Sequence, residues 1–168
     1  MSLLDVARRL DLSRGLRAVD AARRWWFSVE VPSADGIVVD ADTATVNEWL
    51  RNEHHFEKAT AAYYYVGEDQ NLRRAEGFDT INTPTGERVV MMELHPRLFR
   101  IDADSYSTFI HVHYEASRVE APDAHIAEHG MSWDEGVSRM LGLLADPDSP
   151  DFEYRRVTTD SPLHPTEP

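Results

Sequence analysis

Alternating hydrophobic and polar positions dominate the middle of the chain, between two regions with helical spacing. Alternation with a period of two is typical of strands. It predicts five of them, with the sequences TAAYYYV, NLRRAEGF, GERVVMMEL, RLFRID and YSTFIHVHYEA. The connections are short and carry glycine, proline or aspartate, which predicts an antiparallel meander. A further short strand, FSVEV, is expected directly after Trp25 and Trp26.

Helical spacing is clearest after the last of these strands. A capping box from Ser132 to Glu135 opens a helix whose apolar residues recur every three or four positions as far as Leu144. Another helix is expected after Asp42, and two more within residues 1–24.

Together these elements predict an α+β fold. We expect N-terminal helices, a mainly antiparallel sheet that is curved in one version of the fold, and a long C-terminal helix packed on it. The 168 residues then divide into a basic helical arm (1–24), an α+β core domain (25–146) and a polar, proline-rich tail (147–168). Along the last predicted strand, alternation places His111 and His113 on the face opposite the core, toward solvent.

Charge separates the N-terminal arm from the rest of the chain. The formal net charge is −13, whereas residues 1–24 carry six arginines against three aspartates. The acid-rich, lysine-poor composition resembles that of proteins from salt-loving organisms. A basic arm on an acidic body predicts docking on an acidic partner surface. The expected contact residues are the arginines of the arm and the two tryptophans after it: Arg8, Arg9, Arg14, Arg17, Arg23, Arg24, Trp25 and Trp26.

The composition also limits which classes of binding partner and which cellular location the sequence predicts. The negative charge disfavours nucleic acid and anionic membrane. The segment LLDVARRLDLSRGLRAV resembles a helix-turn-helix, but its apolar positions are one residue out of phase. The absence of cysteine excludes disulfides and thiolate metal sites. With no apolar run near the roughly 18 residues of a membrane span, we expect a cytoplasmic protein, or one incorporated in a particle assembled in the cytoplasm.

Four of the eight histidines fall within nineteen residues, at spacings that suit a metal ion. His111 and His113 are two apart on the last predicted strand. His125 and His129 are four apart on a short helix expected over residues 122–130. Each pair therefore lies on one face of its element, and the four together form a candidate zinc site.

The segment from His125 to His129 spells H-x-x-E-H and is similar to the inverted zincin motif. The resemblance implies a zinc hydrolase in which the two histidines bind the metal and Glu128 acts as general base. A third ligand would come from the strand histidines, Glu115 or Glu135.

The leading interpretation is a non-enzymatic structural or interaction subunit of a larger assembly, such as a homo-oligomer or a virus particle. Its partners would be proteins, and it would need no cofactor. The first alternative is a metal-dependent hydrolase that uses zinc at the H-x-H and H-x-x-E-H histidines. The second is a small-molecule-binding domain whose curved sheet encloses an apolar cavity, lined by Tyr63, Tyr65, Met91 and Trp133.

Overall fold

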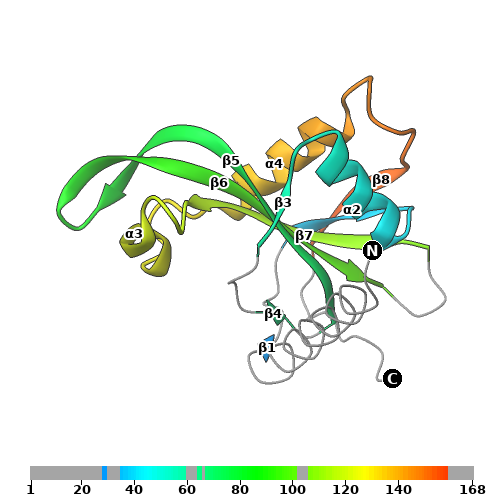
Figure 1. The fold of residues 1–168 in the computed structure, drawn as a ribbon, viewed down its shortest axis with the longest axis horizontal. Coiled ribbons are helices and arrows are strands. Elements are labelled where there is room, and N and C mark those ends of the chain that lie inside the picture. The colour runs from blue at the N-terminus through cyan, green and yellow to red at the C-terminus, as the bar shows by residue number, and fades with distance from the viewer. Residues whose placement is uncertain (1–27, 30–34, 60–63, 66, 102–105, 159–168) are drawn as a thin grey trace, which may run out of the picture.

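A six-stranded sheet with the strand order β3-β5-β6-β7-β2-β8 forms the centre of the protein. The computed structural model describes residues 28–29, 35–59, 64–65, 67–101 and 106–158 (Figure 1). All neighbours in the sheet are antiparallel. A separate parallel pair joins β1 (Ser28–Val29) and β4 (Tyr64–Tyr65). The strands of the large sheet are β2 (Asp35–Val39), β3 (Glu57–Lys58), β5 (Glu68–Thr83), β6 (Gly86–Arg100), β7 (Thr108–Ala116) and β8 (Tyr154–Thr158).

Three helices occur in the described part of the chain, and local capping explains where two of them begin. They are α2 (Thr43–Asn52), α3 (Pro122–Ile126) and α4 (Trp133–Leu144). The Asp42 side chain accepts a hydrogen bond from the Thr45 amide, and Ser132 accepts one from the Glu135 amide. These side chains satisfy amides that have no partner inside the helix.

The predicted fold class is wrong in its helical part. The described residues form mainly antiparallel sheet with three short helices, and no long C-terminal helix is packed on the sheet. The helix α4 has 12 residues, and the chain then returns as β8, which pairs with β2. Residues 154–158 of the predicted tail therefore belong to the sheet. The predicted arm at 1–24 lies outside the described residues, as do Trp25 and Trp26.

The main hydrophobic core covers one face of the sheet. Leu94 and Leu98 of β6 and Ile110 and Val112 of β7 are fully buried there. The side chains that meet them come from α2 and α4: Val46, Trp49, Leu50, Val137, Met140 and Leu144. Both helices place apolar residues three and four positions apart, so each presents one apolar stripe to the sheet.

The hairpin of β5 and β6 extends beyond the rest of the sheet (Figure 1). The last partner that β7 offers to β6 is Ala116, opposite Met92, whereas the hairpin continues to its turn at Gly86. The outer part packs against α3 in a small second core. Phe78 and Val89 of the hairpin remain 72% and 68% exposed. No helix in the described ranges is long and apolar enough to cross a membrane.

Candidate metal centre

The second face of the sheet carries a row of buried polar side chains. His111 is fully buried, and His113 and Glu115 are 5% and 6% exposed, so the prediction that this face of β7 points to solvent is wrong. The register sets His95 of β6 opposite His113. Buried polar residues of the neighbouring strand β6 lie beside the histidines, and the Trp133 ring packs against His111 and His113. Alternation within β7 alone does not reveal these contacts.

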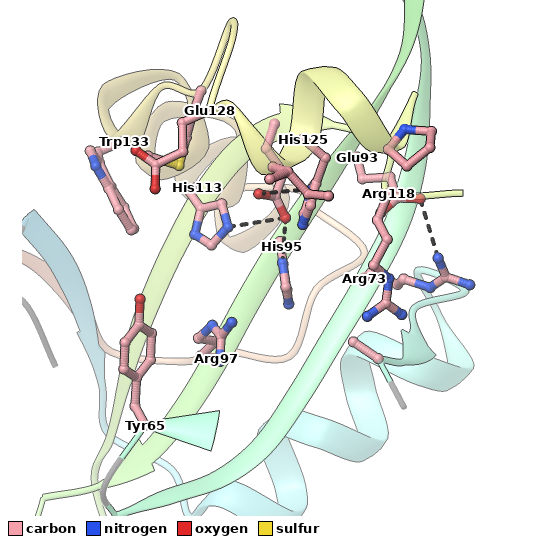
Figure 2. A pocket seen from close by; sticks show the side chains of 15 residues that line it. Tyr65, Arg73, Glu93, His95, Arg97, His113, Arg118, His125, Glu128 and Trp133 are labelled. Atoms are coloured by element: carbon pink, nitrogen blue, oxygen red, sulfur yellow. Dashed lines mark hydrogen bonds and ion pairs between the residues drawn. The ribbon is translucent and has the colours of Figure 1, made fainter. Parts of the chain in front are cut away.

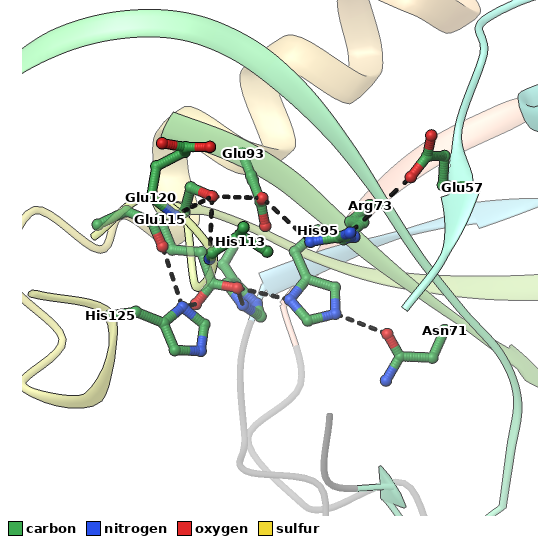
Figure 3. Close-up of polar contacts among 12 residues, drawn as sticks. Glu57, Asn71, Arg73, Glu93, His95, His113, Glu115, Glu120 and His125 are labelled. Carbon is green, nitrogen blue, oxygen red and sulfur yellow. Dashed lines mark hydrogen bonds and ion pairs between the residues drawn. The ribbon is translucent and has the colours of Figure 1, made fainter. Parts of the chain in front are cut away.

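Glu115 is the centre of this row (Figure 3). Its Oε1 lies 2.5 Å from His95 Nδ1 and 3.1 Å from His113 Nε2. Its Oε2 lies 3.4 Å from His125 Nδ1. Burial by itself would raise the pKa of Glu115, but the hydrogen bond from His113 and the contact with His95 outweigh it and hold the pKa well below its usual range. The group is therefore a carboxylate surrounded by three imidazoles.

His95 lies between two oxygen atoms that both accept hydrogen bonds. Its Nε2 is 2.6 Å from Asn71 Oδ1, and its Nδ1 faces Glu115. The Asn71 side chain also hydrogen-bonds to Glu68. Only the amide nitrogen can donate to a carboxylate, so the amide oxygen is the atom that faces His95.

The protonation state of His95 makes this arrangement unusual. Burial lowers its pKa from 6.5 to about 3, against the opposing effect of the Glu115 hydrogen bond. A neutral imidazole has a single N–H, which the Asn71 oxygen places on Nε2. The lone pair on Nδ1 then meets the Glu115 oxygen at 2.5 Å. Two acceptors at that distance need a proton between them, because two ligand atoms on one zinc ion would lie about 3.3 Å apart.

His113 completes a set of three possible ligands. One ligand atom from each of His95, His113 and Glu115 can be chosen so that all lie within 4.8 Å of one another. Two histidines and a glutamate are a ligand set of catalytic zinc sites, which leave a fourth position open. The other ring nitrogen of His113, Nδ1, is buried and has no hydrogen-bond partner within the described ranges.

The three ligands lie on the wall of a pocket of about 510 Å³ (Figure 2). The sheet forms one side, with His95, Arg97 and His113 among the lining residues. The segment between β7 and α4 forms the other side and contributes Arg118, Pro122, His125, Ile126, Glu128 and Met131. A metal ion at the histidines would therefore be reachable by a small molecule.

Two further carboxylates on this face are paired with arginines. Arg97 donates to Glu68 over 2.7 Å, and its guanidinium lies 4.4 Å from the centre of the Tyr65 ring. Burial raises the pKa of Glu68, and the Arg97 charge opposes that rise. On the other side of His95, Arg73 donates to Glu93 over 3.3 Å. These charges are balanced within the protein.

The structure brings together two of the four predicted metal ligands. His113 and His125 both contact Glu115. His111 packs against Trp133 at 4.5 Å between ring centres and is not among the residues that line the pocket. His129 does not line it either.

The H-x-x-E-H segment does not form one helical face. The helix α3 ends at Ile126, and Glu128 adopts a positive φ of 54°. His125 and His129 therefore lose the helical i, i+4 relation on which the motif depends. Glu128, the predicted general base, lies on the pocket wall with an exposed side chain.

His95 is a candidate ligand that the sequence pattern did not point to. The dipeptide His95-Pro96 suggests a turn, but β6 runs straight through it, with Pro96 opposite Val112. The available signal was the alternation of Glu93, His95 and Arg97 with apolar neighbours.

Comparison of the chain with protein-family models, curated proteins and solved structures finds no match. Its function is therefore argued from the geometry of the pocket.

Proposed function

We propose that this protein binds one divalent transition-metal ion of the zinc class and uses it to hydrolyse a small molecule. The ligands are His95, His113 and Glu115. The observation that carries the proposal is the position of His95 between two acceptor oxygens, because a buried neutral imidazole cannot donate to both. Nδ1 of His95 and the Glu115 carboxylate would hold a metal ion in place of the missing proton, with the two atoms further apart than 2.5 Å.

The surroundings of His95 suit this role. A histidine that binds a metal through one nitrogen commonly donates from the other to an oxygen, which fixes the orientation of the ring. Asn71 Oδ1 supplies that oxygen at 2.6 Å. Metal binding requires neutral imidazoles and an ionised carboxylate. Burial favours the neutral form of His95, and the hydrogen bond from His113 favours the ionised form of Glu115.

The chemistry expected of such a site is hydrolysis of an ester or amide. The metal supplies Lewis-acid activation of a carbonyl group and of water. His125 Nδ1 lies 3.0 Å from the Ala116 carbonyl oxygen, which can only accept, so Nδ1 carries a proton. The neutral ring then keeps a lone pair on Nε2. His125 would take the proton of the attacking water and deliver it to the leaving alcohol or amine as the carbonyl–heteroatom bond breaks.

Zinc titration of the EDTA-treated full chain tests this proposal. We expect one zinc ion per chain by equilibrium dialysis and mass spectrometry. His95→Ala and Glu115→Gln should each weaken binding at least about tenfold, because the loss of even an outer-shell partner has roughly this effect. His129→Ala is the matched control, since His129 belongs to the motif but not to the pocket wall, and it should retain zinc.

Two results would contradict the proposal. One is the absence of zinc binding by the folded wild-type chain. The other is loss of zinc in His129→Ala together with retention in His95→Ala, which would favour the H-x-x-E-H site. Circular dichroism of each variant separates loss of ligand from loss of fold.

The assembly-subunit interpretation is a second candidate. Its predicted contact residues lie outside the described ranges. The exposed Phe78 and Val89 of the projecting hairpin support it, because large apolar side chains on a surface often mark protein contacts. Light scattering in high salt tests it, and a monomer at every concentration would speak against it.

A further inference from the structure

Apolar side chains are among the residues that line the pocket beside the proposed metal ligands. The Trp133 ring packs edge-on against His113, with 4.7 Å between ring centres. Met131, Pro122 and Ile126 also line the pocket, and 81% of the Ile126 surface is exposed. Ile126 directly follows His125, which contacts Glu115. A molecule whose polar group reached the histidines would therefore have its other end against these side chains.

The charged residues of the pocket do not call for a charged substrate. Arg97 is bound to buried Glu68, and Arg73 is bound to Glu93. The net charge of −13 also repels anions at long range. Among the arginines that line the pocket, Arg118 alone forms no ion pair within the described part of the chain. If the substrate were an anion instead, Arg118 would be the residue that binds it.

We propose that the substrate is a neutral ester or amide with an apolar acyl or aryl group, and that this group packs on Trp133, Met131 and Ile126. This inference rests on the proposed function, because a metal ion held by His95, His113 and Glu115 would fix where the reacting carbonyl lies. The pocket of about 510 Å³ lies in the range that binds small organic molecules. Covering Ile126 removes apolar surface from water and favours binding.

Hydroxamates of different tails test the substrate class on the zinc-loaded full chain. Acetohydroxamate carries the metal-binding group alone, hexanohydroxamate adds four methylenes, and succinic monohydroxamate adds a carboxylate. Each fully buried methylene is worth about fourfold in affinity. With half of the added chain buried, calorimetry should show hexanohydroxamate binding at least about tenfold more tightly than acetohydroxamate.

Two matched variants locate the apolar group. Ile126→Asp should reduce the gain from the longer tail, taken as the ratio of the two hydroxamate affinities on the same variant, to less than about threefold. Val119→Asp places the same charge on another exposed apolar residue, 62% exposed and not part of this pocket. It should keep the full gain, because Val119 does not contact the tail.

The outcomes separate this inference from the proposed function. Absence of zinc binding overturns both. Binding of zinc and acetohydroxamate without a gain from the longer tail overturns the substrate class alone. Tightest binding of succinic monohydroxamate overturns it in favour of an anionic substrate at Arg118. An unchanged gain in Ile126→Asp overturns the placement of the apolar group.

Discussion

Replacement of His111 by phenylalanine should make the protein more resistant to acid. His111 is fully buried, and neither ring nitrogen has a hydrogen-bond partner in the described ranges. Burial lowers its pKa from 6.5 to about 3, and the charges of His113 and Arg97 add to the effect. His111 is therefore protonated near pH 6.5 in the unfolded chain, whereas in the folded chain it stays neutral until the pH approaches 3.

The sign and the size of the effect follow from this difference. A group whose pKa is lower in the folded state contributes full stability above its unfolded pKa and loses it as the pH falls. For His111 the loss begins near pH 6.5 and ends near pH 3. Each pH unit in that window costs about 1.4 kcal/mol, so lowering the pH from 8 to 5 costs about 2 kcal/mol.

Urea unfolding in EDTA at pH 8, 6.5 and 5 provides the assay. His111→Phe should lose about 2 kcal/mol less than the wild type between pH 8 and 5. At pH 8 the variant should be at least as stable, because a buried polar group without a partner costs roughly 1–3 kcal/mol. His111→Leu separates overpacking by the phenyl ring from loss of the titrating group. Parallel pH curves for all three proteins would refute the reasoning.

Two further substitutions test the packing around the site. An added Cβ on Gly136 of α4 would lie 2.5 Å from the His113 Cα, so Gly136→Ala should lower the melting temperature and weaken zinc binding. An added Cβ on Gly142 of the same helix meets nothing within 4 Å. Gly142→Ala should therefore stabilise the protein by up to about 1 kcal/mol. Equal melting temperatures would show that α4 does not press on β7. Arg97→Met should cost about 3–5 kcal/mol in urea unfolding, because Glu68 stays buried without its cation. Adding Glu68→Gln should restore part of the loss, and an additive double variant would contradict the pairing.

Local signals in the sequence correctly predict where the helices α2 and α4 begin. The Asp42 and Ser132 caps lie where helices α2 and α4 begin, and the apolar Val46, Trp49 and Leu50 of α2 are buried. These features depend on residues three or four apart, so the pattern contains them. The strand β8 is different. Its five residues are mostly polar and exposed, so only pairing with β2 marks it as a strand.

The candidate site depends on contacts that a local pattern does not contain. His113 and His125 stand out by spacing, but their convergence on Glu115 requires the chain to return from α3. His95 joins them only through the register of β6 with β7. A one-residue shift in that register would place His95 on the opposite face. The alternation in β7 shows which residues share a face of the strand. It does not show that both faces are buried.

Two buried carboxylates on this face of the sheet, Glu68 and Glu115, differ in a way that bears on the proposed function. Arg97 and Glu68 form a closed pair, in which a buried cation and a buried carboxylate compensate each other at 2.7 Å. Glu115 carries an equally buried negative charge, but its nearest partner is His95, whose pKa burial lowers to about 3. A buried carboxylate without a cation is costly. A purely structural role would be served better by an arginine at position 95, as at Arg97. The imidazoles instead leave the Glu115 charge without an arginine partner, and this supports the proposed metal site.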